Sequence, residues 1–210
     1  MGARPAAGGG RFVDVAPERL SRWLANFATR HGPYTADGLT VTAADGAVAV
    51  FEPPPGAAGV PDLDALAATA TAPRTLGLLL ARKGAIAVGV AEGAELAVSK
   101  VDTHYVQGRT AAGGWSQQRF ARRRANQARA ATADGTGIAE RVLLPRVRDF
   151  AALVTGGDRS AVDAILAART LEPLAGLRAD RFLDVPEPRH AVLVEAIAAA
   201  RAVRVLVKDP

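Results

Sequence analysis

The sequence predicts an α/β fold in which a mixed β-sheet is flanked by helices. Short apolar runs bounded by glycine turns alternate with helical segments, most clearly in the second half of the chain. Hydrophobic residues make up 49% of the 210 residues, enough to build a substantial core. We therefore expect one main domain preceded by a small appendage made of a helix and a β-hairpin.

Residues 1–72 are expected to form this appendage, with about the first ten residues disordered. Residues 17–30 predict an amphipathic helix, because large apolar side chains recur there at helical spacing. These are Leu20, Trp23, Leu24 and Phe27. Two alternating runs at 39–42 and 47–51 flank an Asp-Gly pair and predict a hairpin. A short helix is expected near 62–69.

Residues 73–210 are expected to form the main domain. Three apolar runs at 76–82, 85–90 and 94–100 are separated by Lys-Gly and Glu-Gly dipeptides, which predicts an antiparallel meander of three strands. A glycine-rich loop follows, and then a helix from about Ser116 to Thr132.

The remainder of this half alternates between helices and strands. Asp134-Gly-Thr-Gly137 is expected to end the first long helix, and a second helix to run over 138–151. Later elements follow the same alternation, with strands at 153–158, 181–185 and 202–207 and helices at 160–168 and 189–200. This order predicts a mixed sheet with helices packed on it.

The amino-acid composition sets only broad limits on the function of the protein. The net charge of +5 and the isoelectric point near 10.4 fit an anionic partner, although an arginine bias with abundant alanine, glycine and proline is also typical of high-GC codon usage. The chain has no cysteine, which excludes disulfides, thiol nucleophiles and cysteine metal sites. No signal peptide or apolar run of about 18 residues occurs, so we expect a cytoplasmic protein without membrane contact.

The segment from Arg109 to Arg129 is the most informative part of the chain. It contains no aspartate or glutamate, although a solvated helix face normally mixes both signs. On a helical wheel one arc is apolar, at Phe120, Ala121, Ala125 and Ala128. The opposite arc carries Arg119, Arg122, Arg123, Asn126 and Arg129. This arc predicts contact with RNA phosphates, and the alternative is a merely solvated arginine face.

The loop before this helix has features of a site. Gly113 and Gly114 permit close approach of the backbone to a ligand, and their free N–H groups can bind an anion. Trp115 either packs into the fold or stacks on a base. Gln117 and Gln118 are neutral amides that can orient a water molecule, or they are ordinary residues of the helix start.

The stretch from Gly113 to Arg124 resembles the catalytic loop and following helix in the middle domain of eukaryotic and archaeal translation release factors. That loop reads Gly-Gly-Gln-Ser and precedes an Arg-Phe-Ala-Arg helix, as in Arg119-Phe-Ala-Arg122 here. The similarity in element order covers roughly residues 74–207 and is closest to the actinobacterial-type branch of the Vms-like release factors. It implies an RNase H-like mixed sheet and a peptidyl-tRNA hydrolase acting in ribosome rescue.

The resemblance also implies roles for residues of the loop. Trp115 stands where release factors have their glutamine, and Ser116-Gln117 fits the Vms-like version of the loop. Gln117 is therefore the implied catalytic amide with Gln118 as the alternative, helped by the backbone of Gly113 and Gly114. The loop would enter the peptidyl transferase centre of the large ribosomal subunit. The residues implied to bind rRNA or tRNA are Arg109, Trp115, Arg119, Arg122, Arg123, Asn126 and Arg129.

Other residue patterns predict no site. The three histidines lack metal-ligand spacing, and no cofactor motif is present. Leu153-Val-Thr-Gly-Gly-Asp158 lacks the lysine of a phosphate-binding loop and predicts a tight structural turn. Two other functions remain open, a non-catalytic adaptor that binds the ribosome or RNA and a nuclease that cuts tRNA near its 3′ end. A monomer is expected, although the sequence does not fix the oligomeric state.

Overall fold

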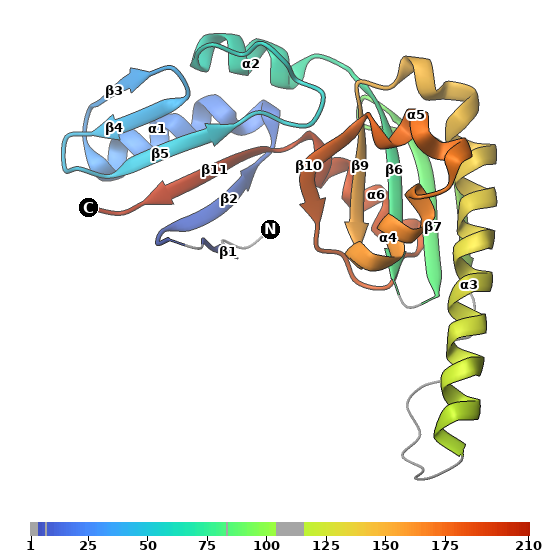
Figure 1. The fold of residues 1–210 in the computed structure, drawn as a ribbon. Helices are drawn as coiled ribbons and strands as arrows, with labels where there is room; N and C mark the ends of the chain where they lie inside the picture. Colours follow the sequence, from blue (N-terminus) through green and yellow to red (C-terminus); the bar gives the residue numbers. More distant parts are fainter. Residues whose placement is uncertain (1–3, 7, 83, 104–115) are drawn as a thin grey trace. The chain divides into compact units, whose positions relative to one another are not determined.

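The computed structural model describes residues 4–6, 8–82, 84–103 and 116–210, and for residues 116–121 and 123–125 it describes the backbone alone. The chain forms two compact units (Figure 1). The first unit comprises residues 1–73 together with 198–210, and the second comprises residues 74–197. The α/β class expected from the sequence is confirmed, with helices packed on two sheets.

An antiparallel sheet forms the first unit, with the strand order β1-β2-β11-β5-β4-β3. Its strands are β1 (Arg4–Pro5), β2 (Arg11–Val15), β3 (Tyr34–Asp37), β4 (Thr40–Ala43), β5 (Val48–Glu52) and β11 (Val203–Lys208). The hairpin expected near residues 39–51 is confirmed as β4 and β5. Part of the tip expected to be disordered pairs instead, because Arg4 and Pro5 lie opposite Phe12 and Arg11.

Two helices cover one face of this sheet. They are α1 (Leu20–His31), which follows the short 3-10 helix η1 (Pro17–Arg19), and α2 (Leu63–Thr71). Both helices bury side chains in one apolar cluster with alternate residues of the strands, because successive strand side chains point to opposite faces. The cluster includes Phe27 of α1, Leu66 of α2 and Val205 of β11.

The final strand differs from the sequence expectation. Residues 202–207 were expected to join the sheet of the main domain, but β11 pairs with β2 on one side and β5 on the other. The reason is physical: Val203, Val205 and Val207 complete the apolar face on which α1 and α2 pack. The first unit is therefore built from both ends of the described chain.

The second unit contains a mixed sheet, with the strand order β10-β9-β6-β7-β8. These strands are β6 (Thr75–Arg82), β7 (Ala85–Glu92), β8 (Glu95–Thr103), β9 (Ala152–Gly157) and β10 (Arg178–Leu183). The expected meander is confirmed, since β6, β7 and β8 pair antiparallel in succession. Strand β9 runs parallel to β6, and β10 runs parallel to β9.

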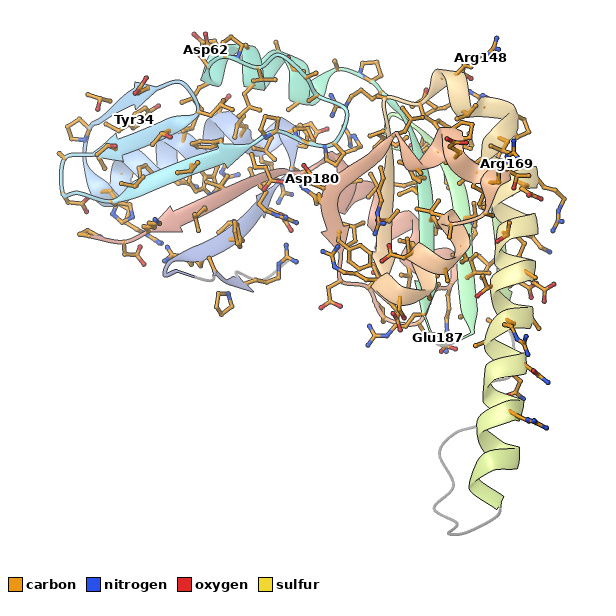
Figure 2. All side chains as sticks on the ribbon, viewed as in Figure 1. Tyr34, Asp62, Arg148, Arg169, Asp180 and Glu187 are labelled. Carbon is orange, nitrogen blue, oxygen red and sulfur yellow. The ribbon has the colours of Figure 1, made fainter. Side chains whose placement is uncertain are left out.

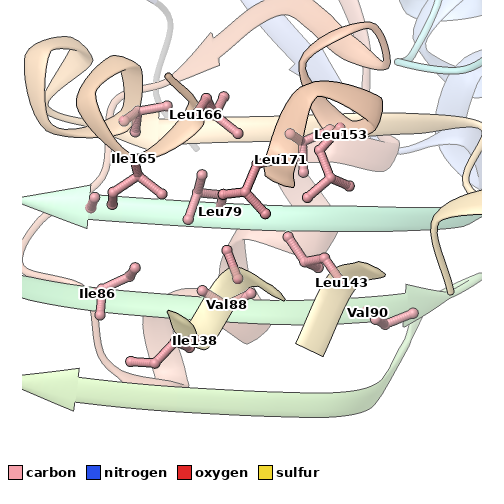
Figure 3. Packing of buried hydrophobic residues seen from close by; sticks show 14 of the residues in the cluster. Leu79, Ile86, Val88, Val90, Ile138, Leu143, Leu153, Ile165, Leu166 and Leu171 are labelled. Atoms are coloured by element: carbon pink, nitrogen blue, oxygen red, sulfur yellow. The ribbon is translucent and has the colours of Figure 1, made fainter. Parts of the chain in front are cut away.

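Helices pack on both faces of this sheet. The long helix α3 (Ser116–Leu143) and α4 (Arg159–Leu166) bury residues in one cluster with β6, β7 and β9 (Figure 3). On the opposite face, Leu193 of α6 (His190–Arg201) lies where a side chain on Gly89 of β7 would sit. Shorter helical segments connect the larger elements, namely η2 (Leu144–Asp149), η3 (Arg169–Leu171) and α5 (Glu172–Ala175). None of the helices in the described residues is long and apolar enough to cross a membrane.

Candidate functional site

Helix α3 is one continuous helix and does not end at Asp134-Gly-Thr-Gly137 as the sequence predicted. Gly135 is buried, and a Cβ there would lie 2.8 Å from Cδ1 of Ile165 and 3.0 Å from Cδ1 of Ile86. This glycine therefore serves close packing against α4 and β7 instead of a turn, and its φ is not in the left-handed region. The expected second helix over 138–151 is replaced by the end of α3 and by η2.

The C-terminal part of α3 anchors the helix in the core. Ile138, Ala139 and Leu143 are fully or almost fully buried against the sheet (Figure 3). Before Gly135, in contrast, none of the described side chains of the helix is buried. At 1.5 Å per residue the backbone from Ser116 to Gly135 spans about 28 Å. The N-terminal part of α3 is thus an arm that extends beyond the sheet (Figure 1).

The described part of the polar arc of the arm is exposed to solvent. Arg122, Asn126 and Arg129 are all exposed, and Nη2 of Arg129 donates a hydrogen bond to Oδ1 of Asn126 at 2.5 Å. Arg119 and Arg123 belong to the same helix, although their side chains lie outside the described residues. The sequence from residue 103 to 133 has no carboxylate, so the arm presents a field of one sign.

The expected apolar arc of the arm does not pack on the sheet at the one position where its side chain is described. Ala128 is exposed, and it borders a hollow of about 300 Å³ together with Ala131 and Thr132. The opposite wall of this hollow comes from β6, β7 and α4, through residues such as Ala81, Ile86 and Ile165. Arg122 and Arg129 of the predicted polar arc and Ala128 of the predicted apolar arc are thus all exposed.

The candidate catalytic residues lie at the start of the arm. Gln117 and Gln118 occupy the first turn of α3, where the helix N–H groups have no intrahelical partner and no acidic residue is present. The expected residues Arg109, Gly113, Gly114 and Trp115 lie outside the described residues. The described backbone therefore locates the two glutamines at the far end of the arm.

The turn expected after the strand at 153–158 is present at the base of the arm. Gly157 has φ of +98°, and a Cβ there would lie 2.3 Å from the backbone oxygen of Ala81. Oδ1 of Asp158 accepts hydrogen bonds from the hydroxyl of Ser160 at 2.7 Å and from the backbone N–H of the same residue at 2.8 Å. The Ser160 hydroxyl is the main cause that lowers the pKa of Asp158 below its ordinary value. Asp158 thereby caps α4.

Several titratable residues outside the arm have structural partners. Nδ1 of His31 lies 2.9 Å from Oδ2 of Asp45, which links the end of α1 to the β4–β5 turn. Glu187 pairs with Arg189 at 2.9 Å, and Asp184 lies 3.8 Å from Arg82. Among the described residues no group of three histidine, cysteine or acidic side chains is placed to hold a metal ion.

Comparison with known protein families shows the family to which the chain belongs. The profile of the family described as the Actinobacteria/chloroflexi VLRF1 release factor matches residues 74–206, more than half of the chain. The chain belongs to this release factor family. The match includes the mixed sheet, the arm and most of β11, and it indicates a role of the release-factor type in translation.

Solved structures similar to this chain include two archaeal proteins. One is the archaeal translation termination factor aRF1, with 15% identity and a TM-score of 0.41, where the match covers 60% of this chain and 36% of that chain. The other is described as an archaeal protein, with 13% identity and a TM-score of 0.40, where the match covers 89% of this chain and 72% of that one. A search of curated protein sequences found no match.

Proposed function

We propose that this release factor is a ribosome-associated peptidyl-tRNA hydrolase that frees nascent chains from stalled ribosomal complexes. The observation that carries the proposal is the arm of α3, which holds Gln117 about 27 Å from the buried Gly135 on a helix with no described buried side chain in between. An enclosed ester inside the ribosome is reached by a narrow, extended element of this kind. Membership of the release factor family supports the same function.

The proposed reaction is hydrolysis of the ester between the peptide and the 3′-terminal adenosine of tRNA. Gln117 and backbone N–H groups of the Gly113-Gly114 loop would position a water molecule. The water oxygen forms a bond to the ester carbonyl carbon, the bond to the ribose oxygen breaks, and the ribose oxygen takes up the proton. The unpartnered N–H groups at the start of α3 favour negative charge nearby, which is the charge that develops on the carbonyl oxygen.

The exposed arginines supply the proposed affinity for RNA. Arg122 and Arg129 lie on the same side of the arm with Asn126 between them, at spacings of about one helical turn. Phosphates of rRNA or tRNA along this side of the arm would pair with these guanidinium groups. The arm would then be held in place by charge, while the loop at its end would act on the ester.

A release assay with single substitutions tests this proposal. Peptide release from purified stalled complexes should fall by about 100-fold or more in Gln117→Ala, the scale expected for loss of one positioned polar group at the reacting centre. Gln127→Ala on the same helix is the matched control and should release peptide at the normal rate, and both variants should bind ribosomes equally. Full activity of Gln117→Ala would exclude Gln117 as the catalytic amide. A loss of release confined to Gln118→Ala would assign that role to Gln118.

A second candidate function is a ribosome-binding adaptor without catalysis. It is favoured by Trp115, which occupies the position of the release-factor glutamine in an ungapped comparison of the loops. Ribosome binding without release from any stalled complex would establish the adaptor. The RNA product separates both functions from a tRNA nuclease, because ester hydrolysis leaves the terminal adenosine intact and phosphodiester cleavage does not. Trp115→Ala in the same assay reports whether the indole contributes to binding or to release.

A further inference from the structure

The first unit carries an exposed polar stripe on α1 that none of the preceding functions uses. Arg19, directly before the helix, is followed by Arg22, Asn26 and Arg30 at intervals of three or four residues, and all four are exposed. Helix α1 contains no aspartate or glutamate. Among the described residues, none of these three arginines takes part in an ion pair. The guanidinium groups are therefore available to an external anion.

The stripe repeats the residue order of the arm. On α3 the corresponding series is Arg119, Arg122, Asn126 and Arg129, again at intervals of three or four residues. Residues at such intervals lie on one side of a helix. Each unit thus presents one helix with arginines on both sides of an asparagine and without carboxylates on that stripe.

A partly exposed aromatic ring lies beside the stripe on α1. Trp23 is stacked on Phe27 with ring centroids 5.5 Å apart and meets Phe51 edge-on at the same distance, so its ring is held in a fixed orientation. It remains half-buried and borders two hollows between α1 and β2, of about 270 and 620 Å³. Both hollows also include Asn26, while Arg30 borders the first and Arg19 and Arg22 border the second.

The charge around these hollows is positive. Asp14 is the carboxylate among their described lining residues, and it is already bound by Arg4 at 2.9 Å and by Arg204 at 3.3 Å. Glu18 lies close in sequence but points to Arg201, with 2.6 Å between the charged atoms. Both acidic groups are thus paired with other arginines, and so is Asp209, which pairs with Arg11. Glu18 and Asp209 attract Arg19 and Arg30 through space without forming an ion pair with them.

We propose that this surface of the first unit, formed by Arg19, Arg22, Trp23, Asn26 and Arg30, binds a single-stranded segment of RNA. Its guanidinium groups bind successive phosphates, and the exposed part of the Trp23 ring stacks on an unpaired base, the combination found in sites for single-stranded nucleic acid. Asn26 offers an amide to a base edge or a ribose hydroxyl. This site is independent of peptide release, because it involves no residue of the arm.

The test uses the full-length chain carrying Trp115→Phe, which leaves Trp23 as its one tryptophan. Titration with a short oligouridylate should quench the fluorescence of Trp23. The affinity derived from this quenching should fall steeply as salt is added. Adding Arg19→Ala with Arg22→Ala should lower the affinity by about tenfold at low salt. It should also reduce the slope of log affinity against log salt by about 1.4, the value for two lost phosphate contacts to a single strand.

A matched control removes the same charge elsewhere. Arg148 and Arg169 are exposed on the second unit (Figure 2), and the double variant Arg148→Ala/Arg169→Ala should keep the affinity within about twofold. Unchanged Trp23 fluorescence on adding RNA, an equal loss of affinity in both double variants, or the same quenching by polyglutamate each overturns the proposal. Peptide release distinguishes its failure from that of the hydrolase, because release depends on Gln117 and the RNA site of the first unit does not.

Discussion

Gly135 of α3 lies so close to Ile165 of α4 that a Cβ on the glycine would come within 2.8 Å of the isoleucine Cδ1 atom. The contact is where the arm enters the core, immediately before the buried residues Ile138 and Ala139. A glycine inside a helix costs about 1 kcal/mol relative to alanine. Here that cost is offset because the helix can approach α4 and β7 closely enough for the following turns to be buried.

Replacing this glycine by a large residue should loosen the anchor of the arm. Gly135→Leu should lower the free energy of unfolding by about 1–3 kcal/mol, the range for overpacking of a filled core, as measured by urea denaturation. Gly137→Leu is the control on the same helix, because a Cβ there meets just the end of the Arg141 side chain at 3.3 Å. The control should be as stable as the wild type or more stable by up to about 1 kcal/mol. Equal destabilisation by both substitutions would contradict the packing role of Gly135.

Asp158 is expected to stabilise the second unit as the cap of α4. Asp158→Ala should lower the free energy of unfolding by about 1 kcal/mol at neutral pH, since two backbone N–H groups and the Ser160 hydroxyl lose their acceptor. Ala164→Ser, at an exposed position of the same helix, serves as the control and leaves the cap intact.

The same cap should depend on pH in a defined direction. Hydrogen bonds to the carboxylate, first of all from Ser160, lower the pKa of Asp158 below 3.8 in the folded state, so the unfolded state binds the proton more readily. The stability due to ionised Asp158 is therefore complete above the unfolded pKa and is lost as the pH falls through the lower, folded pKa. The difference in unfolding free energy between wild type and Asp158→Ala should be constant from about pH 5 to 7 and shrink below pH 3.8. A difference that grows on acidification would contradict this assignment.

The arginines of the arm should contribute a salt-dependent part of ribosome binding. The double variant Arg122→Ala/Arg129→Ala should sediment with large ribosomal subunits less efficiently, with a loss of about tenfold or more at low salt that narrows as salt increases. Arg141 is also exposed but lies in the anchored part of α3, so Arg141→Ala combined with Arg148→Ala is the charge-matched control. A loss that does not change with salt would show that the arginines act through the fold and not through phosphates.

The sequence predicts the elements that local signals define. It does not predict which distant segments of the chain pair or pack with one another. The meander and the β4–β5 hairpin follow from alternation and glycine turns, which are local. The pairing of β11 with β2 and β5 is not local, and an apolar strand of this kind fits either sheet. The sequence around Gly135 predicts a helix break because a break and a close helix contact both favour glycine. The spacing of Arg19 and Arg22 is readable in the sequence, but no site is predicted there.

The rigidity of the arm should matter for function while contributing little to the stability of the core. Ala130 is exposed in the part of α3 that precedes Gly135. Ala130→Pro removes one helix hydrogen bond and clashes with the preceding turn, so it should bend the arm and redirect the residues at its end. Peptide release should fall at least tenfold. The urea midpoint should change little, because the arm has no described buried side chain.

Ala130→Ser is the appropriate comparison, since it keeps the backbone N–H group and the helical φ and lowers the helix propensity by only about 0.5 kcal/mol, against about 3 kcal/mol for proline. It should release peptide at close to the wild-type rate. If Ala130→Pro also released peptide normally, Gln117 would not need a straight helix to reach the ester, and the span of about 28 Å from Ser116 to Gly135 would lose its role in the proposed function. If the proline instead unfolded the whole second unit, the arm would belong to the cooperative core, which its exposed side chains argue against.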